Sequence, residues 1–256
     1  MQIPEFLLSA TWLLPIAPNN IALTDHGVAV RDGRITAVAP ISDLIQQFPD
    51  CSHTHLQDQI LSPGLVNAHG HAAMSLMRGV GAGLALQEWL QKAIWPFEAK
   101  YMDAQAVALG TELAFAEMLL SGTTTLADMY FFPETVARVA HQTGMRCQIS
   151  APIINFATSW SRDADDALHK TMALYDEYRY HPLIRVAFGP HSAYSLERKH
   201  LNQIAMYADE LEAAVQIHLN ETQREVAQAH EQLGHGYVEL LRDTGLLGPR
   251  LQTVHM

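Results

Sequence analysis

The sequence has few cysteines, few basic residues and no long apolar run, and each shortage argues against a class of protein. Two cysteines among 256 residues make no disulfide framework and suit a reducing compartment. The 16 Lys and Arg residues against 27 Asp and Glu leave a formal charge of −11, whereas a nucleic-acid partner would need a basic face. No apolar run is long enough to span a bilayer and the first residues form no cationic leader, so we expect no membrane association and a cytoplasmic location.

Histidine, in contrast, is abundant, with 14 residues. An apolar run that starts at Leu61 ends in His69-Gly70-His71. On a β-strand, residues two apart point to the same face, so the two imidazoles would stand side by side at the end of the strand. Gly70 between them leaves room for a bulky object near the backbone, and imidazole is the commonest metal ligand in proteins.

Strand-like and helix-like segments alternate from about residue 58 onward. Alternation of this kind indicates a parallel sheet with helical crossovers, and the apolar strands indicate burial on both faces. The expected strands cover residues 60–69, 123–129, 146–153, 184–190, 213–219 and 251–255. The expected helices cover residues 103–121, 133–143, 165–179, 196–211 and 224–244.

Six βα units in one series favour a barrel over an open sheet, although periodicity alone does not separate the two. A (β/α)8 barrel of the TIM type needs two more strands than residues 58–256 contain, so either the fold is not a closed barrel or the chain is incomplete. Residues 1–57 read instead as a small β-unit, with a hairpin signal at Asp32-Gly33 and a short helix from Ile41 to Phe48.

Polar side chains stand at the carboxyl ends of the expected strands, where barrel enzymes carry their functional groups. These residues are His69, His71, Asp128, His191, His218, Glu221 and His255. His218 is the natural third ligand beside His69 and His71, because catalytic zinc sites use three protein ligands and a water. Glu221 would act as general acid and base, and His255 would hold and deprotonate the hydrolytic water.

Simpler roles compete with these assignments. Taken alone, His191 could equally be a polar cap at the end of its strand. Asp128 could cap the helix that follows it. His53 and His55 have the same spacing as His69 and His71, but no apolar strand precedes them, so we do not expect them to bind metal.

The segment from Pro63 to His71 resembles the opening motif of the amidohydrolase superfamily. Three later segments narrow the resemblance to the methylthioadenosine/S-adenosylhomocysteine deaminases, which are related to the triazine hydrolases. These segments are Phe188-Gly189-Pro190-His191-Ser192-Ala193-Tyr194, His218-Leu219-Asn220-Glu221-Thr222 and Thr253-Val254-His255-Met256. The similarity extends over essentially the whole chain.

This resemblance implies one zinc ion in an amidohydrolase barrel, next to a small β-sandwich of which residues 1–57 are the N-terminal part. It implies His69, His71 and His218 as metal ligands, with iron and manganese as alternatives to zinc. It also implies that Glu221 protonates the purine ring, that His255 steers the water and that a small-molecule nucleoside is the substrate, as in purine salvage. His191 would contact the purine, and Trp89 and Glu98 would line the pocket and bind the ribose, although the sequence by itself predicts only helix residues at both positions.

Some features depart from the family pattern and leave alternatives open. The family's last metal ligand, an Asp after the eighth strand, has no counterpart in this chain. Arg162 is a candidate partner for a substrate carboxylate.

The expected activity is zinc-dependent deamination of 5′-methylthioadenosine or S-adenosylhomocysteine. One alternative is a different substrate: another aminopurine, a pyrimidine or a triazine. The other is a non-catalytic fragment or metal-binding scaffold. A homodimer and a larger homo-oligomer both remain open.

Overall fold

The computed structural model of the protein describes residues 4–256, and the chain divides into two compact units. The first unit extends to Gly64 and the second spans Leu65–Met256. The boundary expected from the sequence, between residues 57 and 58, falls inside strand β4 (Ser52–Leu61). Because β4 pairs along its length with β1 (Phe6–Leu13), these residues belong to the first unit.

The first unit is a four-stranded mixed sheet in the order β3-β2-β1-β4. Strands β2 (His26–Arg31) and β3 (Arg34–Pro40) form the predicted hairpin, in which Asp32 and Gly33 both take positive φ angles, 51° and 67°. Helix α1 (Ile41–Gln47) buries Leu44 against Leu7 of β1, as the sequence predicts for a short helix here. That this sheet contributes to a β-sandwich remains a prediction.

The second unit contains a parallel six-stranded sheet in the order β10-β9-β8-β7-β6-β5. Its strands are β5 (Leu65–Gly70), β6 (Thr123–Asp128), β7 (Arg146–Ile153), β8 (Ile184–Pro190), β9 (Val215–Leu219) and β10 (Leu251–His255). Neighbours in the sheet are neighbours in the chain, as in a barrel wound in one direction. Since side chains of β5 and β9 meet by hydrogen bonding although three strands separate them, the sheet is strongly curved.

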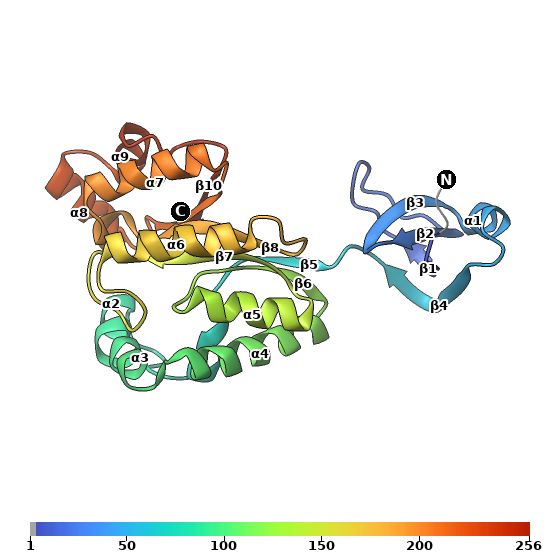
Figure 1. Ribbon diagram of the computed structural model, residues 1–256, viewed down its shortest axis with the longest axis horizontal. Coiled ribbons are helices and arrows are strands. Elements are labelled where there is room, and N and C mark those ends of the chain that lie inside the picture. Colours follow the sequence, from blue (N-terminus) through green and yellow to red (C-terminus); the bar gives the residue numbers. More distant parts are fainter. Residues whose placement is uncertain (1–3) are drawn as a thin grey trace. The chain divides into compact units, whose positions relative to one another are not determined.

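The helices of the second unit lie on the outer side of this sheet (Figure 1). The crossover helices are α4 (Ala104–Leu120), α5 (Pro133–Thr143), α6 (Ala164–Tyr178), α7 (Arg198–Glu210), α8 (Gln223–Leu233) and α9 (Tyr237–Asp243). The long connection from β5 to α4 contains η1 (Ala72–Met77), α2 (Leu86–Trp89), η2 (Leu90–Ile94) and α3 (Trp95–Tyr101), and η3 (Ala193–Ser195) follows β8.

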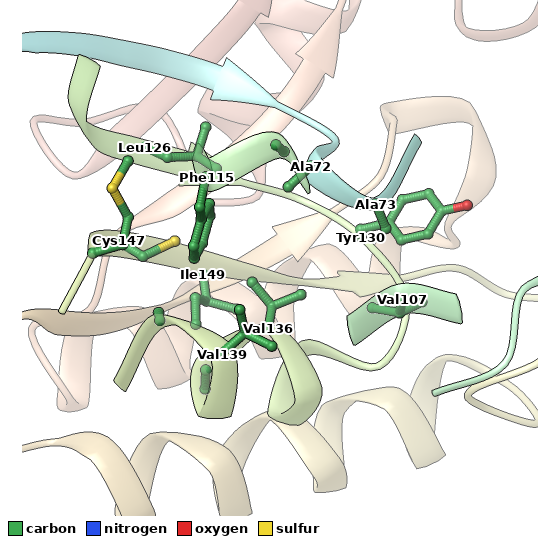
Figure 2. Close-up of a cluster of buried hydrophobic side chains, with 14 of the residues drawn as sticks. Ala72, Ala73, Val107, Phe115, Leu126, Tyr130, Val136, Val139, Cys147 and Ile149 are labelled. Carbon is green, nitrogen blue, oxygen red and sulfur yellow. The ribbon is translucent and has the colours of Figure 1, made fainter. Parts of the chain in front are cut away.

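One apolar core joins the first strands of this unit to their helices. Figure 2 shows side chains from α4, β6, α5 and β7 meeting there, among them Phe115, Leu126, Val136 and Ile149. All four are fully buried, and burying side chains of this size contributes roughly 1.5–3 kcal/mol each. The ends of β5 and β6 are therefore held on a rigid base.

Three sequence predictions differ from the structure. The expected strand over residues 60–69 is divided between two strands, because the chain is not extended in a sheet at Pro63-Gly64, between the end of β4 and the start of β5. The expected helix over residues 224–244 is also two, because Gly234 takes φ 74° and ends α8 before α9 begins. Strand β4 was not predicted, since its residues are mostly exposed and polar. Across residues 4–256, none of the helices has both the length and the apolar character needed to cross a bilayer.

Candidate metal and active site

His69 and His71 lie at the carboxyl end of β5, where the sequence predicts them. Their ring centroids are 4.7 Å apart. The His218 ring, from β9, lies 4.8 Å from the His69 ring and 5.4 Å from the His71 ring. The curved sheet thus brings together three imidazoles from two segments that are about 150 residues apart in the chain.

Hydrogen bonds set the tautomers of all three imidazoles. His218 Nδ1 donates to the His191 carbonyl at 2.8 Å, and His71 Nδ1 donates to the Met129 carbonyl at 2.5 Å. His69 Nδ1 donates to Oε1 of Gln216 at 3.2 Å, and the orientation of that amide is fixed because its Nε2 donates to the Ala68 carbonyl. A neutral imidazole that donates through Nδ1 keeps an unprotonated Nε2.

The Nε2 atoms of His69 and His218 are 3.1 Å apart. Two lone pairs that face each other at this distance repel unless a cation lies against both. Nitrogens bound at roughly 2.1 Å to one tetrahedral zinc ion are about 3.4 Å apart, which is close to the observed separation. Donation through Nδ1 to a carbonyl or amide is also the usual support of a histidine metal ligand. These residues therefore fit a divalent metal.

Burial lowers the pKa of each of these imidazoles. It lowers the pKa of His218 to about 2, with a further contribution from His191 and His71, and that of His69 to about 4, with a contribution from His71. The pKa of His71 is also lowered, chiefly by burial. The three rings are consequently neutral at pH 7, which is the form that binds metal.

The end of β6 clamps the turn that carries His71. The Met129 carbonyl accepts from the His71 ring, and the Met129 N–H donates to the Gly70 carbonyl at 3.0 Å. Asp128 accepts from the Ala72 N–H at 2.6 Å through Oδ1. Asp128 thus caps the turn after His71 rather than helix α5, which was one reading of the sequence; α5 has Phe132 at its N-cap position.

Asp128 is completely buried, and its Oδ2 has no hydrogen-bond partner in the described part of the chain. Burial raises the pKa of this carboxyl to about 7, against an ordinary value of 3.8. The ionised form of Asp128 is therefore destabilised relative to the protonated form in this environment.

His255 and Glu221 lie beside the three imidazoles. Ligand nitrogens of His69, His218 and His255 fall within 4.8 Å of one another, so within residues 4–256 these three also form a group that could hold a metal ion. The sequence predicts His71, not His255, as the ligand beside His69 and His218, and the His71 ring lies nearer to the His69 ring, at 4.7 Å, than the His255 ring does, at 5.8 Å. His255 Nε2 lies 3.6 Å from Glu221 Oε1, so an acid–base pair borders the cluster.

The Glu225 carboxylate holds the loop that carries Glu221. It accepts from the Asn220 N–H at 3.1 Å and from the Glu221 N–H at 2.9 Å. Asn220 takes φ 55°, a left-handed conformation that Asn tolerates better than most residues. Glu225 was not predicted from the sequence, although its position four residues after Glu221, on an amphipathic helix, was a usable signal.

His191 lies against the cluster, and Glu98 is connected to it. The His191 ring is 4.8 Å from the His218 ring, and burial lowers the pKa of His191 to about 4. Glu98, on α3, accepts at 2.7 Å from the hydroxyl of Tyr130, whose ring centroid lies 6.5 Å from that of His71. Trp89 packs partly buried against the apolar core and donates its indole N–H to the Val80 carbonyl at 2.8 Å.

Two other sequence candidates have local partners. Arg162 is exposed and pairs with Asp166 at 2.9 Å on the first turn of α6. His53 and His55 belong to the first unit, where Nε2 of His53 and Nδ1 of His55 both hydrogen-bond the hydroxyl of Ser9, at 2.8 and 2.9 Å. The spacing of His53 and His55 places both rings on the same face of β4, where they bind the Ser9 hydroxyl and not a metal site.

Gln216 is the supporting residue that the sequence analysis missed most clearly. It is completely buried, and it joins β9 to β5 through His69 and Ala68. It precedes His218 by two positions, so strand periodicity places both on the same face. A buried amide two residues before a strand-end histidine was therefore the available signal.

Comparison with known proteins places these features in a family. The family model described as "Amidohydrolase family" matches residues 60–256. A relative from Saccharophagus degradans, named 5-methylthioadenosine/S-adenosylhomocysteine deaminase, is 46% identical over 98% of this chain and 56% of its own length. A relative of the same name from Thermodesulfovibrio yellowstonii is 35% identical over 98% of this chain and 57% of its own length.

Solved structures agree with this assignment. An adenosine deaminase from Xanthomonas campestris with bound zinc has a TM-score of 0.91 and 38% identity, and the match covers 100% of this chain and 58% of that one. An atrazine chlorohydrolase from Arthrobacter aurescens complexed with zinc, at a TM-score of 0.87 but 18% identity over 97% of this chain and 60% of that one, shows the fold alone. The chain thus spans somewhat more than half the length of these relatives. With its parallel barrel sheet and its histidines at the strand ends, this chain belongs to the amidohydrolase family.

Proposed function

We propose that this protein is a zinc-dependent deaminase of adenine nucleosides, with 5′-methylthioadenosine and S-adenosylhomocysteine as its substrates. One observation carries the proposal: unprotonated Nε2 atoms of His69 and His218 face each other beside the Glu221–His255 pair. A cation site next to a proton-transfer pair is what hydrolytic removal of an amino group requires. The names of the two relatives described above support the choice of substrate.

His69, His71 and His218 would hold the metal ion in this proposal. When bound, zinc lowers the pKa of a coordinated water to about 7 and so supplies a nucleophile at neutral pH. Zinc suits imidazole ligands, as do iron and manganese, so metal analysis has to decide among them. Gln216, Met129 and the His191 backbone keep the three rings in the required tautomer.

Glu221 and His255 handle the protons of the reaction. Water adds to C6 of the adenine ring, and Glu221 delivers a proton to the adjacent ring nitrogen. His255 orients the attacking water and accepts its proton. The C6–N bond then breaks as His255 gives its proton to the leaving amino group. The proton of the new C6 hydroxyl returns to Glu221, so that ammonia and an inosine analogue remain. Glu221 and His255 lie 3.6 Å apart, so both side chains can reach the same substrate and water molecule.

His191, Trp89 and Glu98 would bind the substrate. His191 contacts the purine edge and Trp89 forms a wall of the pocket. Glu98 accepts hydrogen bonds from the ribose hydroxyls. The free cysteines, Cys51 and Cys147, fit a reducing compartment, so we propose a cytoplasmic location. The nucleosides in the names of the relatives support a role in purine salvage.

The test is an ammonia-release panel with the full-length protein, combined with metal analysis. The substrates are 5′-methylthioadenosine, S-adenosylhomocysteine, adenosine, guanine, cytosine and a triazine. We expect the fastest turnover with the first two, and measurable turnover of adenosine, at one zinc per subunit. Turnover of only the triazine or a free base would refute the nucleoside assignment, and a zinc-loaded protein that is inactive on all six would point to a metal-binding scaffold.

A further inference from the structure

We propose that Tyr130 is a positioning residue that holds the Glu98 carboxylate ready for the two hydroxyls of a ribose ring. The proposal rests on the proposed function, since it concerns how the same site recognises a nucleoside. It begins with the only hydrogen bond that the Glu98 side chain makes within residues 4–256, from the Tyr130 hydroxyl to Oε1 at 2.7 Å.

The second oxygen of Glu98 is left open. Within the described chain, Oε2 is not one of the fully buried polar atoms that lack a partner, so it remains accessible. The carboxyl as a whole is nevertheless buried enough for its pKa to be raised. The group is thus largely enclosed, yet one of its oxygens still reaches solvent. An enclosed carboxylate with a free acceptor atom is suited to a ligand that brings hydroxyl donors.

Tyr130 connects this carboxylate to the metal site. It follows Met129, whose carbonyl orients the His71 ring, and its own ring lies 6.5 Å from His71. The body of Tyr130 packs with the apolar core, while its hydroxyl points away from the labelled core side chains (Figure 2). One short segment, Met129-Tyr130, therefore contacts both His71 and Glu98, where the proposed function places the base and the sugar of the nucleoside.

The hydrogen bond also keeps Glu98 in the form that accepts. Burial raises the pKa of Glu98, and donation from Tyr130 opposes that rise by stabilising the charged form. Burial and the neighbouring Glu98 charge raise the pKa of Tyr130, so the phenol stays protonated and donates throughout the working pH range. A vicinal diol offers two donors, and an oriented carboxylate can accept both.

The experiment uses the full-length zinc enzyme with the substitution Tyr130→Phe, which removes the hydroxyl and keeps the ring. Its substrates are adenosine and 2′,3′-dideoxyadenosine, which share the base and differ in the diol. We expect the ratio of kcat/KM for adenosine to that for the dideoxy compound to fall at least tenfold, through KM. Adding Tyr130→Phe to Glu98→Gln should lower the ratio less than twofold further.

Tyr175→Phe is the matched control, because Tyr175 also donates one hydrogen bond of 2.7 Å, to the Leu211 carbonyl. This control should leave the ratio unchanged. Equal losses of kcat/KM on both substrates in the Tyr130 variant would indicate a merely structural role and overturn the proposal, as would an unchanged ratio.

A second readout separates this proposal from the proposed function. Carboxyl titration by difference infrared spectroscopy, with Glu98→Gln identifying the signal, should show a higher pKa for Glu98 in the Tyr130→Phe protein than in the Tyr175→Phe protein. If the wild type deaminates no nucleoside, the proposed activity fails. The proposed link between Tyr130 and Glu98 then stands or falls on this titration and on the affinity for adenosine relative to its dideoxy analogue.

Discussion

Replacing Asp128 by Asn should change how the stability of the metal-free protein depends on pH. Asn keeps an oxygen that can accept from the Ala72 N–H, so the turn after His71 retains its 2.6 Å hydrogen bond. It removes the titrating group, whose Oδ2 is buried without a partner in the described chain. The variant therefore isolates the electrostatic cost of this carboxyl from its structural contact.

The sign follows from the two pKa values. Burial raises the pKa of folded Asp128 to about 7, whereas the ordinary value of 3.8 applies after unfolding. Below pH 7 the folded protein binds a proton that the unfolded chain releases, so this carboxyl stabilises the fold at pH 5 relative to pH 8. The effect accumulates over the two pH units between pH 5 and the folded pKa of about 7, at about 1.4 kcal/mol per unit. Wild type should therefore lose about 3 kcal/mol of unfolding free energy between pH 5 and pH 8, and Asp128→Asn should not show this loss.

The assay is urea denaturation of chelator-treated protein at pH 5, 6, 7 and 8, taking the difference in unfolding free energy between variant and wild type. Buried histidines such as His218 titrate in the opposite sense, and the difference cancels their contribution. Asp176→Asn is the control, because Asp176 is exposed in the same unit. A variant-minus-wild-type difference that stays constant across the pH range would refute the reasoning.

Three further predictions concern the site and its support. Glu221→Gln should lower kcat at least a thousandfold while bound zinc, measured by atomic absorption, stays at the wild-type level; an active, zinc-loaded variant would remove Glu221 from the proton transfer. His218→Asn should weaken zinc at least a hundredfold in a competitive chelator titration, and unchanged affinity would exclude His218 as a ligand. Gly110→Ala should destabilise the protein by about 1–3 kcal/mol in thermal unfolding, because a new Cβ would lie 2.9 Å from Cα of Ala73. Gly248→Ala, where a Cβ meets nothing within 4 Å, should have a much smaller effect, and equal losses would contradict the packing argument.

Local periodicity predicts much of the second unit. Apolar runs locate β6, β7, β8 and β10, and the rule that functional groups follow parallel strands singles out His69, His71, His218 and His255 before any coordinates are known. The errors occur where local signals were weak or misread: Pro63-Gly64 divides one expected strand, and Gly234 divides one expected helix. Both positions carry the residue types that commonly end such elements.

Pairs that are distant in sequence could not be predicted from it. The contact between Tyr130 and Glu98 joins a strand end to a helix 32 residues earlier, and that between Gln216 and His69 spans 147 residues. Each depends on the curvature of the sheet and on the path of the β5–α4 connection, and neither leaves a periodic pattern. The role of Asp128 was open for the same reason, because its partner, the Ala72 N–H, lies on another strand end.

The glutamines inside the barrel have a consequence for how a newly made chain acquires its metal. Gln216 and Gln252 both donate to the carbonyl of Ala68, and Gln148 donates to Gln252 at 3.1 Å, so tethers from β7, β9 and β10 converge near β5. While the ribosome has made only β5 to β8, His69 and His71 have neither their third imidazole nor the amide that sets the tautomer of His69. Under the proposed function, capture of the metal ion therefore has to wait until β9 has been made, and we expect a chain stalled before residue 216 to bind no zinc at this site.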